Sequence, residues 1–355
     1  MSEAAATRET NTVSATSAQY PPGWPHLLVR GLERLPGPTW VAYLVLVLVI
    51  SLVMHSRGWS RGDAPAGTFD PTSAYWGLLG GVLLWTFRYL ERAAAAAFDA
   101  FRPALAPAGD PERLRHELTT IPRTPAIVVA FVATLLTVTS LAFEPDGSDV
   151  DGVPGPVFVA VVVVQAFMTS FLFAFVYLLI RQARQVRLIL DRWAVIDIFR
   201  PGPLNAFPRL MATSGASVVL MVGTTVVLAD PAAAGSFLVS WAPYVVAPSV
   251  VAVIAFVVPL YGTHQRLAAE KVRLADEAEE RLKGLLGQVD RDIDARDLGG
   301  LDPLDRALSL VLKEREIVAK LPTWPWSVGT ARGFVSAILL PLALYLAQRF
   351  LSQVV

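Results

Sequence analysis

The chain has 355 residues, no net formal charge and no cysteine, and 54% of its residues are hydrophobic while 17% are charged. Its mean hydropathy of +0.50 is higher than that of an ordinary soluble globular protein, so a membrane is the expected solvent. The balanced charge excludes a bulk attraction to nucleic acid. The lack of cysteine excludes disulfides, thiolate metal sites and cysteine nucleophiles.

Apolar residues gather into seven runs along the chain. Residues 1–35 are polar, and we expect them to be a disordered N-terminal segment. Most of the runs that follow reach the roughly 17 to 25 residues that a helix needs to cross the hydrocarbon core. They lie at 39–55, 73–90, 125–143, 156–180, 211–229, 242–262 and 333–351. The sequence thus predicts an all-α fold, a polytopic transmembrane helix bundle of about seven spans, six within 36–262 and the last within 322–355.

The loops between these runs differ in charge. Arginine and lysine are frequent in the loops after the second, fourth and sixth runs, whereas the loops after the third and fifth contain none. Short loops rich in basic residues stay on the cytoplasmic side of a membrane. The pattern predicts a multi-pass protein of the cell membrane whose N-terminus is cytoplasmic and whose C-terminus is external.

Several runs continue as helical patterns beyond the bilayer, and the longest continuation follows the sixth run. Within 263–293 apolar residues recur at spacings of three and four and the rest is dense in charge, which is typical of an amphipathic helix. The stretch "DLGG" interrupts this pattern, and a second amphipathic stretch follows. We expect 263–321 to form a cytoplasmic helical hairpin of the coiled-coil kind. The hairpin either packs only on the chain's own inner loops, or contacts a second copy of the chain or a cytoplasmic protein through 263–320.

The stretch "LPTWPW" separates this hairpin from the last run. Pro322 and Pro325 prevent one helix from running through, and Trp324 and Trp326 are of the type that lies in the headgroup zone. We interpret the four residues as a hinge at the membrane surface. The alternative is an aromatic platform for a ligand.

Polar side chains at membrane depth are few. The central parts of the runs hold no Asp, Glu, Lys, Arg or His, and Gln165, with Thr169 and Ser170 one turn further on, is the most polar group at depth. These three residues form the candidate intramembrane polar site. We favour an interhelical hydrogen bond for Gln165 over contact with a substrate.

No enzymatic motif accompanies these features. The four histidines are far apart in sequence, and neither a metal-binding pair nor a phosphate-binding glycine loop occurs. We therefore assign no catalytic residue, no cofactor and no metal site, and expect the protein not to be an enzyme.

Four stretches, "RLRHELTTIP", "VIDIFRPGPLNAFPRL", "VPLYGTHQRLAAEKVRL" and "LPTWPWSVGTARGF", together with the shorter "FRPAL", give the chain a resemblance. After about residue 75 it resembles a family of uncharacterised prokaryotic multispan integral membrane proteins. The resemblance carries no activity, so it assigns no site residue. It implies that the inner-surface elements belong to one architecture.

Three functions remain, and the lack of clustered nucleophiles, metal ligands and phosphate-binding loops counts against the third, a membrane enzyme. The first is an integral membrane protein with a cytoplasmic helical module for sensing or protein interaction, with the lipid bilayer and a protein as partners. The second is a channel or facilitator for a small uncharged solute, since the lack of buried charge argues against ion-coupled transport only.

Overall fold

The computed structural model describes residues 19–142, 153–195, 197, 199–200, 202–228, 242–295, 299 and 301–354. It is 84% helical, and no strand occurs in these ranges. The chain divides into two compact units, residues 1–91 with 110–181 and residues 92–109 with 182–355. The fold is therefore all-α, as the sequence predicts.

The first unit contains the N-terminal helices, and two long helices, α3 and α6, leave it for the second unit. Asp110 caps α4 by accepting hydrogen bonds from the N–H groups of Glu112 and Arg113, which are among the donors that a helix start leaves unpaired. The helices of this unit are α1 (Trp24–Glu33), α2 (Thr39–Arg61), α3 (Pro71–Phe101), α4 (Pro111–Thr119), α5 (Arg123–Ala142) and α6 (Gly155–Trp193).

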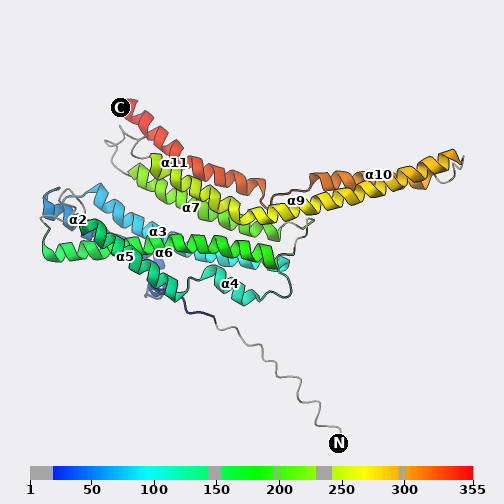
Figure 1. The fold of residues 1–355 in the computed structure, drawn as a ribbon. Helices are drawn as coiled ribbons and strands as arrows, with labels where there is room; N and C mark the ends of the chain where they lie inside the picture. Colours follow the sequence, from blue (N-terminus) through cyan, green and yellow to red (C-terminus); the bar gives the residue numbers. More distant parts are fainter. Residues whose placement is uncertain are drawn as a thin grey trace, which may run out of the picture. The chain divides into compact units, whose positions relative to one another are not determined.

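The second unit holds the ends of α3 and α6 and all later elements. These are the short 3₁₀ helices η1 (Arg102–Ala104) and η2 (Pro203–Asn205), and the helices α7 (Ala206–Leu228), α9 (Ala242–Asp294), α10 (Leu301–Lys320) and α11 (Val328–Val354). Helix α7 contacts both α9 and α11, and α10 contacts α9. In Figure 1, α10 returns alongside the polar half of α9.

Small residues let α2 and α3 approach closely. A Cβ added to Gly77 would lie 2.1 Å from Ser51 Oγ and 2.4 Å from the carbonyl oxygen of Val47, and one added to Gly81 would lie 2.5 Å from Val47 Cγ2. Glycines four residues apart face the same side of a helix and are typical of membrane helix contacts. A larger residue at either position would push the two helices apart.

An aromatic cluster forms the core of the first unit. Phe87 and Phe171 are buried, and their ring centroids are 5.2 Å apart. Trp24 meets Phe171 edge-on at 5.7 Å and donates its indole N–H to the carbonyl of Ala126. The cluster joins α1 to α3, α5 and α6.

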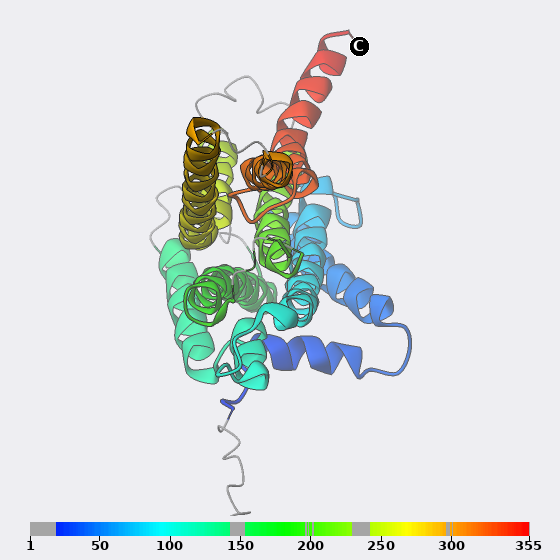
Figure 2. The ribbon, with the colours of Figure 1, turned by 90° about the vertical axis from the view of Figure 1, so that its right-hand side faces the viewer.

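Helix α1 corrects one expectation. Residues 24–33 were predicted to belong to a disordered segment, but they form a helix in which His26 and Val29 are fully buried. Figure 2 shows α1 lying across the direction of α6. Helix α1 forms because its buried side chains meet partners far along the chain, which composition alone does not reveal. Residues 1–18 lie outside the described part.

Helix α9 is the longest element, with 53 residues. Its first part packs on α7, where Gly215 of α7 lies against Ala252 of α9 and Phe334 of α11, and Phe256 of α9 also contacts Phe334. Pro259 lies within the helix and is buried. Because proline has no N–H, the helix loses one internal hydrogen bond at this point.

Four helices of the described part are long and apolar enough to cross a membrane. They are Thr39–Arg61, Arg123–Leu141, Gly155–Trp193 and Val250–Asp294. Helix α11 contributes a shorter apolar stretch, Val328–Leu340, the run at 73–90 lies in α3, and the run at 211–229 lies in α7 as far as Leu228. A membrane protein with several spans is thus supported, and the count of about seven stays a prediction.

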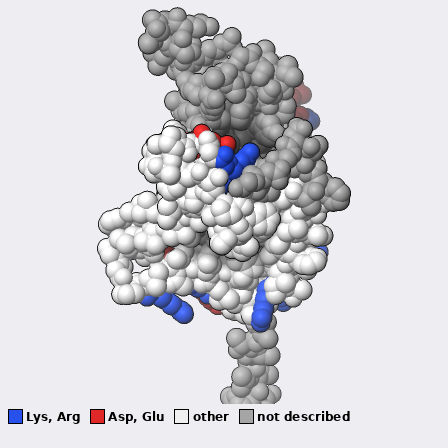
Figure 3. All heavy atoms as spheres, turned by 90° about the vertical axis from the view of Figure 1, so that its left-hand side faces the viewer, with Lys and Arg blue, Asp and Glu red and all other residues white. Residues whose placement is uncertain are grey.

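The outer surfaces of these helices are apolar. In the most apolar window of α2 and of α5 only 17% of the residues are buried. Exposed side chains there include Leu44, Leu48 and Leu52 on α2 and Phe131 and Leu135 on α5. Figure 3 shows that most of the described surface on one face is uncharged. Water would solvate such a surface poorly, so lipid is its natural surrounding.

Candidate functional site

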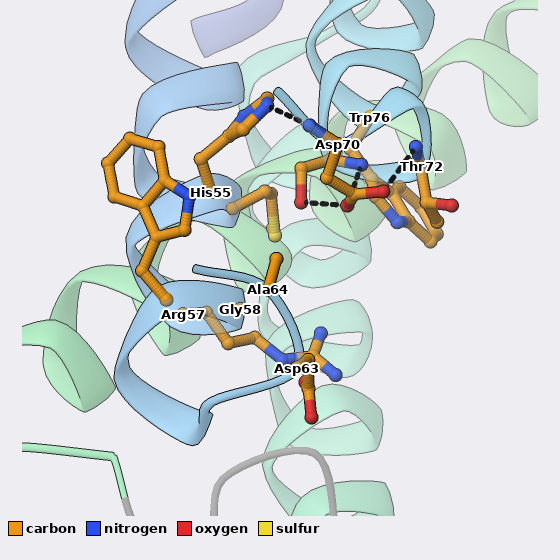
Figure 4. Close-up of a pocket in the computed structure, with 11 residues that line it drawn as sticks. His55, Arg57, Gly58, Asp63, Ala64, Asp70, Thr72 and Trp76 are labelled. Carbon is orange, nitrogen blue, oxygen red and sulfur yellow. Dashed lines mark hydrogen bonds between the residues drawn. The ribbon is translucent and has the colours of Figure 1, made fainter. Parts of the chain in front are cut away.

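The loop between α2 and α3 is held by a histidine (Figure 4). The N–H of Asp70 donates to His55 Nε2 over 3.1 Å, and His55 Nδ1 lies 2.7 Å from the carbonyl oxygen of Ser51. This pattern assigns the ring proton to Nδ1 and makes His55 a structural link between the two helices. A cavity of about 230 Å³ adjoins it, which we call the loop cavity.

Asp70 starts α3 at the rim of the loop cavity. Its carboxylate accepts hydrogen bonds from the N–H groups of Thr72 and Ser73 and from the Ser73 hydroxyl. Partial burial acts to raise the pKa of Asp70, but these hydrogen bonds, those to Ser73 first, lower it below its ordinary value. The charged form is therefore the one that caps the helix.

A larger cavity of about 630 Å³ lies among α2, α3, α5 and α6, and we call it the bundle cavity. It shares Met54 and Trp76 with the loop cavity. Two residues of the candidate polar site, Gln165 and Thr169, line it. Its other lining residues are Leu136, Thr137, Ser140, Leu141, Met168 and Phe173.

The third residue of the candidate polar site, Ser170, has a different role. Its hydroxyl donates to the carbonyl of Ala130 at 3.3 Å and lies 3.3 Å from the Thr134 hydroxyl, so it links α6 to α5. Within the described residues the Gln165 amide makes no hydrogen bond. An interhelical hydrogen bond is thus made by Ser170, one turn further along α6 and on another face, and the interhelical role that we favoured for Gln165 stays a prediction.

A group of ionisable side chains, which we call the α1 clasp, joins α1 to α3. Arg88 donates to both carboxylate oxygens of Glu33 at 2.8 Å and to Glu91 at 2.7 Å. His26 Nδ1 and Arg30 Nη2 lie 3.5 and 3.7 Å from Glu91 Oε1.

The α1 clasp encloses a buried charge. Burial acts to raise the pKa of Glu91, but the neighbouring His26 and Arg88 outweigh it and lower the pKa below its ordinary value. His26 accepts a hydrogen bond from the N–H of Ile121 at its other ring nitrogen, Nε2. The ring thereby ties α1 to the start of α5 as well as to α3.

A second polar group lies beside the clasp. Arg181 donates to the Tyr20 hydroxyl at 2.6 Å and to the carbonyl of Thr120 at 3.1 Å, and the Tyr20 hydroxyl donates to the same carbonyl. Thus residues 19–33 meet α3, α5 and α6 where the predicted apolar runs of these helices begin or end.

The predicted hinge lies in the second unit. Helix α10 ends at Lys320 and α11 begins at Val328, so the prolines do separate two helices. Trp324 stacks on His264 with ring centroids 3.8 Å apart and on Trp326 at 4.1 Å.

Two phenylalanines extend this stack. Phe256 lies 5.0 Å from Trp326 and 4.5 Å from Phe334. We call the series Phe334, Phe256, Trp326, Trp324 and His264 the aromatic ladder. Its tryptophans pack on α9, and the role of the hinge at a membrane surface stays a prediction.

Helix α9 also binds the hinge through polar groups. His264 Nδ1 lies 2.9 Å from the carbonyl oxygen of Thr323, and Lys271 donates to the carbonyls of Ala319 and Leu321 at 2.7 and 2.9 Å. These two carbonyls lie at the end of α10, where a helix has no partners of its own for them. Further along, Arg281 pairs with Glu314 at 2.8 Å, so α9 and α10 run antiparallel.

Sequence reasoning missed the α1 clasp and the Tyr20 group. The only signal was that Arg88 and Glu91 flank the end of an apolar run, where uncompensated charges are costly. Among the described residues, no three or more His, Asp or Glu side chains are grouped so that they could hold a metal ion.

No family model, curated protein or solved structure matches the chain.

Proposed function

We propose that this chain is a non-enzymatic integral membrane protein whose α9–α10 hairpin binds a protein partner on the cytoplasmic side. The observation that carries the proposal is an exposed apolar row on α9. Val272, Leu286 and Ile293 are 59, 44 and 52% exposed. They are separated by multiples of seven residues and share one helix face, on which Glu279, paired with Lys283, lies between Val272 and Leu286. A row of this spacing in a charged segment is what a partner helix covers.

The way in which the hairpin is held supports this proposal. Helix α9 continues from its apolar segment into the hairpin, and Lys271 and Arg281 fasten α10 to it. The apolar row is therefore presented on a fixed surface, which lowers the cost of ordering on binding. The basic residues around the hairpin support its cytoplasmic placement.

Photo-crosslinking in native membranes tests the partner. A photoreactive amino acid at position 286 should give an adduct of higher mass, whereas the same group at Gln288, which is exposed on another face of α9, should not. The adduct mass distinguishes a second copy from another protein. Absence of adducts from 272, 286 and 293 alike would contradict the proposal.

The cytoplasmic placement has its own test, which the cysteine-free chain makes simple. A membrane-impermeant maleimide added to intact cells should label Asp63→Cys in the α2–α3 loop. It should label Asp290→Cys only after the cells are opened. Labelling of both in intact cells would refute the topology.

A facilitator for a small uncharged solute is the second candidate, and the bundle cavity favours it. Its weakness is the closed aromatic core of the first unit, where Phe87 and Phe171 are buried and their rings are in contact. Flux of glycerol into proteoliposomes, lost in Gln165→Leu while the protein stays folded, would raise this candidate above the first.

A further inference from the structure

The bundle cavity combines an apolar wall with hydrogen-bonding groups that the chain leaves unused. Its volume of about 630 Å³ lies within the range of about 300–1,000 Å³ that is usual for small-molecule sites. Every side chain that lines it belongs to the first unit, and none of them is ionisable.

The four polar side chains of the cavity fall into two pairs. Thr137 and Ser140 donate their hydroxyls to carbonyls of their own helix, those of Ala133 and Thr137. Gln165 and Thr169 have no hydrogen bond within the described part of the chain. They lie four residues apart on α6 and so project on one side. The second pair is free to bind a ligand.

The unused pair specifies the polar end of a ligand. The Gln165 amide offers both donors and an acceptor, and the Thr169 hydroxyl offers either. A hydroxyl or an amide satisfies both residues. A charged ligand group would lose its hydration in the cavity and would find no opposite charge on the wall, so its binding would be energetically costly.

The apolar wall specifies the rest of the ligand. Trp76, Phe173 and Leu136 provide rigid and aliphatic surface, and Met54 and Met168 add flexible thioethers that adapt to irregular shapes. We propose that the bundle cavity binds an uncharged alcohol or amide with an apolar body. Its polar end binds Gln165 and Thr169, and its body packs on Trp76 and the two methionines.

The bundle cavity adjoins the loop cavity. Met54 and Trp76 line both of them, so the two cavities meet at these two side chains. The loop cavity carries His55, Arg57 and Asp70, which suit contact with water (Figure 4). On the side toward α1, the core residues Phe87 and Phe171 lie close together. This arrangement suits a site that holds its ligand better than a path that passes it through.

Trp76 provides a reporter for the test. Bromine quenches tryptophan fluorescence at short range, so an undecanol brominated at its far end is the probe, added to the full-length protein in detergent. The part of the quenching that is lost in Trp76→Phe reports binding of the probe in the bundle cavity. Trp85→Phe is the matched control because Trp85 is on the same helix and 57% exposed. We expect this component to saturate and to be reversed by unbrominated undecanol.

The variants decide the proposal. Gln165→Leu should lower the affinity for the probe about three- to tenfold, which is the effect of one lost hydrogen bond. Thr169→Val should weaken it less, and Thr139→Val, an exposed threonine on α5, should leave it unchanged. Circular dichroism and gel filtration confirm folding. Bromoundecane, which lacks the hydroxyl, should not saturate the Trp76 component.

Two outcomes overturn the proposal. One is quenching that rises linearly with probe and is equal in wild type, Gln165→Leu and Thr169→Val. The other is equal binding of bromoundecane and the brominated alcohol. Water-soluble tribromoethanol distinguishes the sources of the ligand. If it binds with the same Gln165 dependence, the ligand comes from water, and if only the long-chain alcohol binds, the ligand comes from the bilayer.

Discussion

The α1 clasp and the aromatic ladder fix helices in two different ways. The clasp holds α1 on α3 through a buried carboxylate and two cations, Arg88 and Arg30, with His26 beside them. The ladder holds the start of α11 on α9 through stacked rings at 3.8 to 5.0 Å. Removing the partner of a buried charge costs a large free energy, because the remaining charge is left uncompensated. Removing one ring from a stack costs only the contacts that this ring made. A single substitution in the clasp should therefore lower the free energy of unfolding more than a single substitution in the ladder.

The largest effect is expected at the centre of the clasp. Glu91→Gln keeps the shape of the side chain and removes the charge that compensates Arg88 and Arg30. We expect a loss of about 3 kcal/mol in the free energy of unfolding, measured by SDS-induced unfolding in mixed micelles. Glu279→Gln, in the solvent-exposed pair with Lys283, is the control and should leave the unfolding midpoint unchanged. Equal losses of unfolding free energy in the two variants would show that the buried charge of the clasp stabilises the protein no more than an exposed ion pair.

Acid should weaken the clasp in the same way. Because the pKa of Glu91 is lower in the folded state than its ordinary value of 4.5, its stabilising effect is complete above about pH 4.5 and is lost as the pH falls through the folded-state pKa. Between about pH 5 and about pH 3, the wild type should lose more unfolding free energy than Glu91→Gln. Parallel pH profiles would show that Glu91 does not contribute.

The ladder should respond less. Trp324→Ala removes the ring between His264 and Trp326, and we expect a loss of about 2 kcal/mol. Hydrogen exchange should show reduced protection at residues 321–327 and at the start of α11, with α1 unaffected. Trp40→Ala, at a tryptophan that is 63% exposed on α2, is the control. Exchange that increases across both units would mean that the ladder is not a local device.

The smallest effect is expected at the polar contact behind the ladder. Lys271→Met keeps the aliphatic part of the side chain and removes the donor to the carbonyls of Ala319 and Leu321. The cost should be about 0.5–1 kcal/mol, typical of a cation at a helix C-terminus, and should appear as fraying of the last turn of α10 in hydrogen exchange. Unchanged protection there would mean that the stacked rings alone, and not Lys271, stabilise this end of α10.

The sequence predicted which segments are helical, but not which side of each helix packs on its neighbours. The charged continuation of α9 beyond its apolar segment and the break at "LPTWPW" followed from periodicity and from proline, because both are local properties. Gln165 and Ser170 were recognised as polar groups at depth. Which of the two meets α5 depends on the rotation of α6 about its axis, and that is set by packing on α2, α3 and α5.

The α1 clasp was unpredictable for a related reason. Helix α1 has only ten residues, and although Pro25 in its first turn and its apolar residues are local helix signals, a helix of this length is marginal without tertiary contacts. Its stability comes from His26 meeting Glu91 and Ile121, which are 65 and 95 residues away in the chain. Only the assembled bundle brings these groups together.

Pro259 gives the aromatic ladder a further significance. A helix of 53 residues is about 80 Å long, and it is softened at Pro259, as at Pro248, because each proline removes one internal hydrogen bond. Phe256 precedes the proline and His264 follows it, and the ladder connects the two through Trp326 and Trp324. The stacked rings act as a splint across a joint. Because the hairpin extends far beyond Pro259, a bend of a few degrees at this residue would displace the tip of the hairpin by several ångströms, and the stacked rings oppose such a bend.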